Sequence, residues 1–376
     1  MKEVSTNSIW PMKPLVEVAK LQRGFDLPVQ EREAGDVPVF AANGPIATHS
    51  SAMCRGPGVI TGRSGTIGKV HFVDTDYWPL NTSLFVVDFC GNHPRWVYHM
   101  LSAFGLERFA QGAGVPTLNR NLVHGELVAV PPLEEQQRIA DVLDKSDILR
   151  RKRQQAIRLA DDFLTAMFID MFGDPVTNPK GWATKTLGEV CSKIGSGATP
   201  KGGDSAYKDE GIALIRSMNV RDGSFLWKDL ARIDDEQASR LSNVVVQADD
   251  VLINITGASV ARVCRAPLEV VPARVNQHVS ILRPNSEVEA SFLEQLLLSS
   301  SVKYQLLQIG EAGATRQAIT KSELESFKII VPPKHEQVRF GRVQSKVSEF
   351  VRKVSVSAET GERLAGSLRS AYFEGK

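Results

Sequence analysis

The chain contains one short segment twice, and this repeat constrains its fold more than any other feature. Residues 130–139 read Val-Pro-Pro-Leu-Glu-Glu-Gln-Gln-Arg-Ile, and residues 331–340 read Val-Pro-Pro-Lys-His-Glu-Gln-Val-Arg-Phe, 201 positions later. Each copy ends a strand-like run, breaks at Pro-Pro, and opens about forty residues with helical periodicity. A chain with two such boundaries is expected to contain two copies of one design.

Four further matches occur in the same order along the chain. The matched ranges are 10–18 with 182–190, 65–70 with 258–263, 81–84 with 276–279, and 118–120 with 319–321. The separation grows from 172 to 201 positions, so the second copy carries 29 extra residues. Five matches in one order indicate an internal duplication.

Each copy combines a mostly β region with a long helix. Short β-like runs, separated by Gly, Pro, Asn and Asp, precede each Pro-Pro break, and one helix is predicted among them, at about 94–112 and about 291–309. Each long helix, of about 60 Å, carries one apolar stripe and needs the other as a partner. We therefore expect an α+β fold with two pseudo-symmetric domains at the ends of an antiparallel coiled coil. The expected bounds are 1–131 and 174–332 for the domains, and 132–173 and 333–376 for the helices.

The composition excludes several classes of protein. With 376 residues, 42% apolar and 23% charged, the chain resembles an ordinary globular protein of two or three domains. The four cysteines form no CxxC pair, which argues against a zinc ribbon and a secreted disulfide scaffold. No apolar run is long enough to span a membrane and no signal peptide is evident, so we expect a cytoplasmic protein. The net charge of +2 does not by itself indicate a nucleic-acid partner.

A glycine-rich stretch at 61–70, Thr-Gly-Arg-Ser-Gly-Thr-Ile-Gly-Lys-Val, superficially suggests a phosphate-binding P-loop. The spacing fails, because the first glycine would fall on Arg63 and Val70 follows the lysine. An ordinary glycine-rich hairpin is one interpretation. The other is a turn that lets a DNA backbone approach and presents donors to it, namely Arg63, Ser64, Thr66 and Lys69. The second copy keeps Thr256, Ser259 and Arg262 but is expected to lose the glycines to alanine.

Other polar clusters recur at matched places in the two copies. Asn, Gln and Arg make bidentate contacts to base edges, although single loop residues of these types are more often simply solvated. Their recurrence favours a nucleic-acid interface. The further candidates are Asn43, Asn81, Thr82, Asn119 and Arg120 in the first copy, and Thr199, Lys201, Arg216, Asn219, Asn276, Gln277, His278, Arg316, Gln317 and Lys321 in the second.

Signatures of catalysis were sought and are absent from the sequence. There is no Asn/Asp-Pro-Pro-aromatic tetrad for methyl transfer to adenine, no GxGxxG after a strand, no HExxH and no His/Cys spacing typical of a metal site. We therefore expect no catalytic, cofactor or metal site in this chain.

Taken together, the repeated segments resemble the specificity subunit of a type I restriction-modification system. The resemblance covers essentially the whole chain and is carried by residues 131–139, 168–175, 182–190 and 195–200. It implies two target-recognition domains that each read half of a bipartite, asymmetric double-stranded DNA site, and long helices that dock methyltransferase subunits, two in number. Those subunits would carry S-adenosylmethionine and modify adenine, and restriction subunits would complete the complex.

The chain departs from the family pattern at Val16, which stands where the second copy has Gly188. Two other functions remain open at this point. One is a fused restriction-modification enzyme, and the other is a coiled-coil scaffold that binds proteins. The target sequence and the length of its spacer do not follow from the residues alone.

Overall fold

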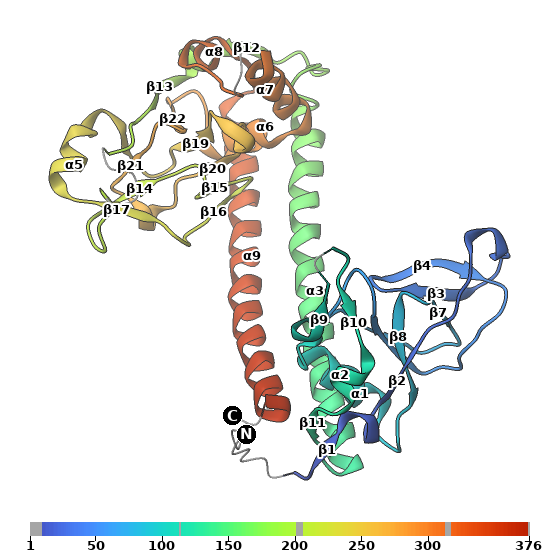
Figure 1. Ribbon diagram of the computed structural model, residues 1–376. Coiled ribbons are helices and arrows are strands. Elements are labelled where there is room, and N and C mark those ends of the chain that lie inside the picture. The colour runs from blue at the N-terminus through green and yellow to red at the C-terminus, as the bar shows by residue number, and fades with distance from the viewer. Residues whose placement is uncertain (1–9, 113, 201–205, 313–316, 375–376) are drawn as a thin grey trace. The chain divides into compact units, whose positions relative to one another are not determined.

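The computed structural model describes residues 10–112, 114–200, 206–312 and 317–374 (Figure 1). The chain divides into two compact units. The first runs to Gln155 and includes the C-terminal segment from Ser355, and the second spans Ala156–Val354. The boundary falls inside both long helices, so each unit contains one globular part, called here the first head (10–131) and the second head (174–332), with portions of both helices.

The first head is built on a four-stranded antiparallel sheet of order β2-β8-β5-β6. A second sheet, β4-β3-β7, pairs β3 with β7 in parallel. Two short antiparallel pairs, β1 with β11 and β9 with β10, complete the strands. The bounds are β1 Met12–Pro14, β2 Lys20–Arg23, β3 Val37–Ala41, β4 Gly44–His49, β5 Gly58–Gly62, β6 Val70–Val73, β7 Trp78–Pro79, β8 Ser83–Asp88, β9 Ala110–Gln111, β10 Thr117–Leu118 and β11 Leu127–Ala129.

The second head repeats this plan. Its four-stranded sheet has the order β13-β22-β19-β20, its second sheet β17-β14-β21-β18 again contains one parallel pair, and β12 pairs with β23 as β1 does with β11. The extra hairpin β15-β16 lies in the longer second copy. The bounds are β12 Ala183–Thr186, β13 Cys191–Ser196, β14 Ile212–Ile215, β15 Val220–Arg221, β16 Ser224–Phe225, β17 Ala231–Ile233, β18 Val245–Val246, β19 Val251–Asn254, β20 Val263–Arg265, β21 Ala273–Val275, β22 Val279–Pro284 and β23 Lys328–Val331. The predicted α+β duplication is confirmed.

The helices of the heads differ from the prediction in two places. The helix expected over 94–112 ends at Ala103 as α1 (Pro94–Ala103), because Gly105 adopts a left-handed φ of 69° and a 3-10 turn and β9 follow. The single helix expected over 291–309 is two helices, α6 (Ala290–Leu298) and α7 (Ser300–Ala312), because Ser299 between them is extended. The shorter helices are α2 Arg120–His124, α4 Leu187–Val190, α5 Asp235–Arg240 and α8 Lys321–Ser326.

The two long helices are α3 (Leu133–Phe172) and α9 (Lys334–Arg369). In the first unit, Asp147 of α3 binds Arg369 at 3.0 Å, and Arg153 donates to Ser357 at 2.8 Å. Because the later residue of α3 meets the earlier residue of α9, the helices run antiparallel there, as predicted. No helix in the described part of the chain is long and apolar enough to cross a membrane.

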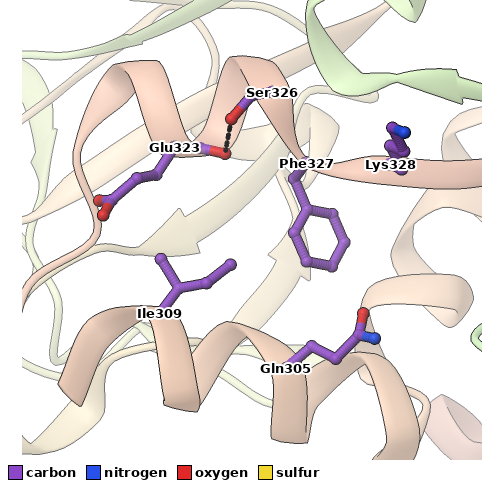
Figure 2. A pocket seen from close by; sticks show the side chains of 6 residues that line it. All are labelled: Gln305, Ile309, Glu323, Ser326, Phe327 and Lys328. Atoms are coloured by element: carbon purple, nitrogen blue, oxygen red, sulfur yellow. Dashed lines mark hydrogen bonds between the residues drawn. The ribbon is translucent and has the colours of Figure 1, made fainter. Parts of the chain in front are cut away.

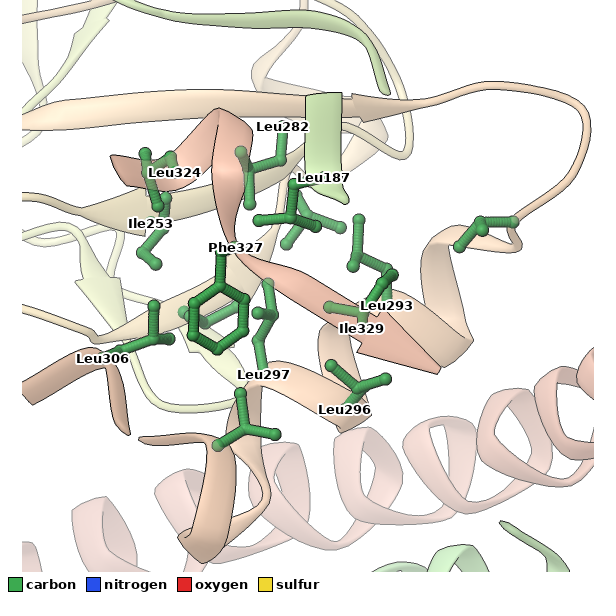
Figure 3. Packing of buried hydrophobic residues seen from close by; sticks show 14 of the residues in the cluster. Leu187, Ile253, Leu282, Leu293, Leu296, Leu297, Leu306, Leu324, Phe327 and Ile329 are labelled. Atoms are coloured by element: carbon green, nitrogen blue, oxygen red, sulfur yellow. The ribbon is translucent and has the colours of Figure 1, made fainter. Parts of the chain in front are cut away.

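Each head is completed by the end of the helix that starts after the other head. In the second unit, Phe172 near the end of α3 packs against Phe292 of α6, with ring centroids 5.0 Å apart. In the first unit, Phe373 just after α9 packs against Trp96 of α1 at 6.3 Å. Phe172 and Phe373 are themselves 201 positions apart, so the duplication extends through the helices into both cores. Figure 3 shows the core of the second head around Phe327, where leucines of α6, α7 and α8 belong to one cluster with Ile253 of β19 and Leu282 of β22.

One buried glutamine attaches each head to the start of its own long helix. In α3, the Gln136 amide accepts from His93 N–H at 2.8 Å and donates to Asn92 Oδ1 and Pro131 O at 2.7 and 2.9 Å. In α9, Gln337 is fully buried and accepts from the backbone N–H that precedes α6 at 2.9 Å. The buried glutamine of each repeated segment therefore has a structural role, because its hydrogen bonds join the long helix to the head that precedes it.

Candidate nucleic-acid interface

The predicted contact residues of the first head gather at one end of the four-stranded sheet. Because the strands are antiparallel, β2 and β5 end at the edge where β8 begins. Backbone hydrogen bonds join the loops there. Ser64 N–H donates to Thr82 O at 3.0 Å, Gly65 N–H donates to Pro116 O at 2.9 Å, and Leu118 N–H donates to Arg63 O at 2.8 Å. Three segments far apart in sequence thus form one rigid edge, called here the first loop edge.

Glycine is required in the turn that forms this edge. A Cβ at Gly62 would collide with the carbonyl oxygen of Thr66, and Gly65 and Gly68 have φ of 89° and 93°, a region that favours glycine. A Cβ on Gly65 would have nothing within 4 Å, so the backbone faces open space there. An exposed glycine backbone beside cationic side chains allows a phosphate chain to approach closely.

Most of the predicted side chains of the first head lie on or beside this edge. Arg63 is half-buried and donates from Nη1 to Asn81 O at 2.9 Å, which orients its guanidinium, while Lys69 is exposed. The Asn81 amide donates from Nδ2 to Asp26. The residues on the same loops or on the adjoining β3-β4 turn are Asn43, Ser64, Thr66 and Thr82.

Two of the candidates serve local structure as well. Asn119 is the N-cap of α2 and accepts from Asn121 N–H at 3.0 Å, and Arg120 donates to Leu21 O at 3.4 Å. Both remain exposed. Burial and the nearby Lys69 ammonium lower the pKa of His71, which lies behind the β3-β4 turn, so this imidazole adds no charge to the first loop edge at neutral pH.

The second head has the same edge, called here the second loop edge, with a corrected alignment. Ile255 N–H donates to His278 O at 2.9 Å, Gly257 N–H to Gln317 O at 2.9 Å, and Ile319 N–H to Ile255 O at 2.8 Å. Gly257, with a φ of 73°, therefore stands where the first head has Gly65, so the prediction that alanine replaces this glycine is wrong. By the same hydrogen bonds, Thr256 is the counterpart of Ser64.

Four predicted side chains of the second loop edge form one hydrogen-bonded chain. Thr199 donates from Oγ1 to Gln277 Oε1, Gln277 Nε2 lies 3.1 Å from His278 Nε2, and His278 Nδ1 lies 2.5 Å from Thr256 Oγ1. Gln277 is exposed and the other three are half-buried. Because Thr199 follows β13 and Thr256 follows β19, the chain spans the end of the sheet.

Several predicted residues of the second head are not available for contact. Asn219 is fully buried, and its amide accepts from Arg216 N–H at 3.0 Å and donates to Leu226 O at 2.9 Å, so it stabilises a turn. Asn276 is 4% exposed and accepts from His278 N–H. Asn219 and Asn276 therefore drop out of the candidate interface, since their buried amides serve the fold. Arg216, on the turn that Asn219 stabilises, places its guanidinium carbon 5.1 Å from the centroid of the Tyr207 ring.

The remaining candidates lie at the margin of the second loop edge. Ser259 accepts from Asn254 Nδ2 at 3.1 Å, and Lys321 pairs with Glu325 at 3.3 Å. Arg262 is half-buried and Gln317 is exposed. Lys201 and Arg316 lie outside the described residues. The exposed Asp26, which accepts from Asn81, was not among the predicted residues, and no feature of the sequence marked it.

Two open clefts lie on the second unit, and none of their lining residues was predicted to bind DNA. One, of about 560 Å³, lies between the segment that precedes α6 and the start of α9. The other, of about 400 Å³, lies between α7, α8 and β23 (Figure 2). The lining residues are Gln305, Ile309, Glu323, Ser326, Phe327 and Lys328. Within the described ranges, no group of His, Cys, Asp and Glu could hold a metal ion.

Comparison with known proteins agrees with this architecture. The chain is similar to the specificity subunits of the type I restriction enzymes MjaVIII of Methanocaldococcus jannaschii (20% identity, 72% of this chain, 67% of the relative) and EcoBI of Escherichia coli (24%, 75% and 65%). A third relative, a specificity subunit also from M. jannaschii, is matched over 61% of its length, so the matches span about two thirds of the length of these three relatives or less.

Solved structures share the fold. The specificity subunit of a type I restriction-modification system from M. genitalium superposes with a TM-score of 0.70 at 14% identity, over 99% of this chain and 98% of that one. A chain from a structure of type I restriction-modification complex assembly superposes with a TM-score of 0.52 at 20% identity, over 96% and 97%. The model of the type I restriction modification DNA specificity domain matches residues 7–159 and again residues 179–353. The chain therefore belongs to the family of type I restriction-modification DNA specificity proteins, and it carries two copies of the family's domain.

Proposed function

We propose that this chain is the DNA-recognition subunit of a type I restriction-modification complex and has no catalytic activity of its own. Each loop edge reads one half of a bipartite site in double-stranded DNA. The observation that carries the proposal is that both heads build the same edge from the same backbone hydrogen bonds but equip it with different side chains, Ser64 and Thr82 in one and Thr256 and His278 in the other. Two similar frames with different side chains suit an asymmetric target.

The first loop edge is proposed to supply affinity through phosphate contacts. Lys69 is exposed and Arg63 is oriented by Asn81, beside the open glycine backbone. Charge-neutralising contacts of this kind make binding fall steeply with salt. Replacing Lys69 by alanine is expected to weaken binding to all duplexes and to reduce the salt slope by about one contact. The matched control is Arg55→Ala, because Arg55 is exposed before the start of β5, at the opposite end of that strand.

The partners are proposed to be two methyltransferase subunits, which bring S-adenosylmethionine and modify adenine, and restriction subunits. Large apolar side chains are exposed along both long helices, and a helix face of this kind is typical of a protein-binding surface. Those more than two-fifths exposed are Leu133, Ile148, Leu149, Leu159, Phe163, Ile169, Phe350, Val356 and Leu364. The same observation favours a protein scaffold as the second candidate function. A complex that acts on the cell's own DNA would work in the cytoplasm.

Two measurements test the proposal. The purified chain, alone and with its cognate methyltransferase subunits, is incubated with a library of random duplexes, and bound DNA is sequenced. We expect a bipartite motif with two different halves from the complex. The chain alone is also assayed for methyl transfer to DNA. Methyl transfer by the isolated chain would make it a fused enzyme, and absence of any selected motif from the complex would favour the scaffold.

Docking on the helices is tested separately. Phe163→Glu is expected to prevent assembly with the methyltransferase subunits in sedimentation experiments, because it puts a charge into an apolar contact. The control is Arg158→Glu at an exposed position on the same helix. Equal assembly of both variants would contradict a role for the apolar face.

A further inference from the structure

The hydrogen-bond chain on the second loop edge has a defined direction. The Thr199 hydroxyl can only donate to Gln277 Oε1, because a carbonyl oxygen has no proton. The Gln277 Nε2 group therefore faces His278 Nε2 as a donor, and that ring nitrogen must accept. The proton of the imidazole then lies on Nδ1 and is donated to Thr256 Oγ1 at 2.5 Å. With the amide oxygen of Gln277 facing Thr199, one arrangement of donors and acceptors satisfies all three contacts.

This arrangement leaves a defined pattern for a ligand. Gln277 is exposed, one lone pair of Oε1 is used by Thr199, and one hydrogen of Nε2 is used by His278. One acceptor and one donor therefore remain, side by side and held in a single orientation. The major-groove edge of adenine presents the complementary pair, an N6 amino donor and an N7 acceptor. Guanine presents two acceptors there, and cytosine a single amino donor.

The first head carries the reversed arrangement at the same place. By the backbone hydrogen bonds at the two edges, Asn81 is the counterpart of Gln277, and Asp26 is the counterpart of Thr199. A carboxylate can only accept, so the Asn81 amide turns its Nδ2 towards Asp26. In the second head the Thr199 hydroxyl, which can donate as well as accept, faces the amide oxygen instead. A carboxylate at this place would exclude the orientation that the Gln277 amide has.

We propose that Gln277 is a specificity-determining residue of the second head that reads one adenine, and that Thr199 and His278 are positioning residues that hold its amide in the reading orientation. The inference rests on the proposed function, since it names the base that one loop edge recognises. Holding the amide before binding lowers the ordering cost of the contact and excludes the flipped amide, which would present its donor and acceptor in the wrong order.

The test is motif selection by the full chain in complex with its methyltransferase subunits. We expect the wild-type motif to contain one adenine in the second half-site whose replacement weakens binding roughly 5- to 150-fold, the range for one bidentate contact. Gln277→Glu should shift preference at that single position from adenine to cytosine, because a carboxylate accepts from the cytosine amino group. Gln277→Met should accept any base there. The other positions of the motif should stay unchanged.

The positioning residues are tested through the same base. Thr199→Asp reproduces the first head's partner and is expected to flip the amide, with loss of the adenine preference, while Thr199→Ser should retain it. The control for added charge is Gln308→Glu, at an exposed position of α7. Thermal unfolding of each variant shows whether the head is still folded. If Gln277→Glu does not fold, Gln277→Met, which adds no charge, tests the same position.

The outcomes separate the two proposals. A wild-type complex that selects no motif overturns the proposed function. A wild-type complex that selects a motif, with no change at any single position in the folded Gln277→Glu and Gln277→Met variants, overturns only the inference. A general loss of affinity in Gln277→Glu, equal to that in Gln308→Glu and with the motif intact, also overturns it, because only added charge would then have acted.

Discussion

Replacing Gln136 by leucine tests how firmly the first head is attached to α3. The side chain is 2% exposed, and the substitution removes its three hydrogen bonds, to His93 N–H, Asn92 Oδ1 and Pro131 O. Each buried group left without a partner costs roughly 1–3 kcal/mol. Leucine regains about 2 kcal/mol through burial of apolar surface. We expect a net loss of about 3 kcal/mol in the free energy of unfolding of the first unit.

The effect is large enough to measure in the intact chain. For a unit of this size, about 3 kcal/mol corresponds to a fall in Tm of roughly 6–12 °C. Calorimetry of the full chain should show the transition of the first unit moving down while that of the second stays in place. Gln337→Leu should give the mirror result, because the fully buried Gln337 makes the equivalent contacts in the second unit.

The matched control is Gln137→Leu, one position along the same helix. Gln137 is exposed, so this change alters composition and helix propensity in the same way but leaves no buried group without a partner. We expect a change within about 0.5 kcal/mol. Unfolding free energies for the Gln136 and Gln137 variants that agree within about 1 kcal/mol would refute the reasoning, since the buried amide would then contribute nothing beyond its volume.

Three further results are expected. Phe172→Ala should lower the free energy of unfolding of the second unit by about 3–5 kcal/mol, because loss of a fully buried ring leaves a cavity. Urea unfolding measures the change, and an unchanged midpoint would contradict a role for the end of α3 in the core of the second head. Burial lowers the pKa of His99 despite its bond to Asp144, so the folded state resists protonation. Stability should therefore be full above about pH 6.5 and fall as the pH drops below it, and His99→Gln should flatten this part of the urea midpoint profile. At pH 8 iodoacetamide should modify the exposed Cys90 before Cys191, because burial raises the pKa of the Cys191 thiol to about 12. Mass spectrometry of the native chain measures the order of modification, and modification of Cys191 first would contradict the prediction.

The duplication was predictable because its strongest signals are tied to backbone geometry. Pro-Pro breaks and helix-opening residues keep the same spacing to the strands they follow, so their separation of 201 positions persists even at Phe172 and Phe373. The break between α6 and α7 was missed because the apolar residues keep a helical period on either side of it. The three successive serines at 299–301 were a local signal for it, since serine is favoured at helix N-caps.

The candidate interface was only partly predictable, because polar residue types do not reveal burial. Asn219 and Gln277 read alike in sequence, yet one holds a turn and the other faces solvent. The alignment of the two turns failed for a related reason. The segment from Gly257 to Val263 is one residue longer than the segment from Gly65 to Val70. Alignment of the two valines therefore placed Gly65 opposite Ala258 instead of Gly257.

Under the proposed function, the two loop edges explain how a duplicated domain reads two different half-sites with one backbone frame. The loops of each edge are held by backbone hydrogen bonds, which do not depend on side-chain identity, so the frame survives substitution. The side chains on the frame lie outside the buried core, so we expect an exchange of Asp and Thr beside the amide to cost little stability. Under the proposed function, a change in such an amide changes the base that is read while the backbone frame stays the same, so recognition can diverge between the heads without a change of fold. The heads therefore retain a common sheet order while Asn81 and Gln277 face opposite ways.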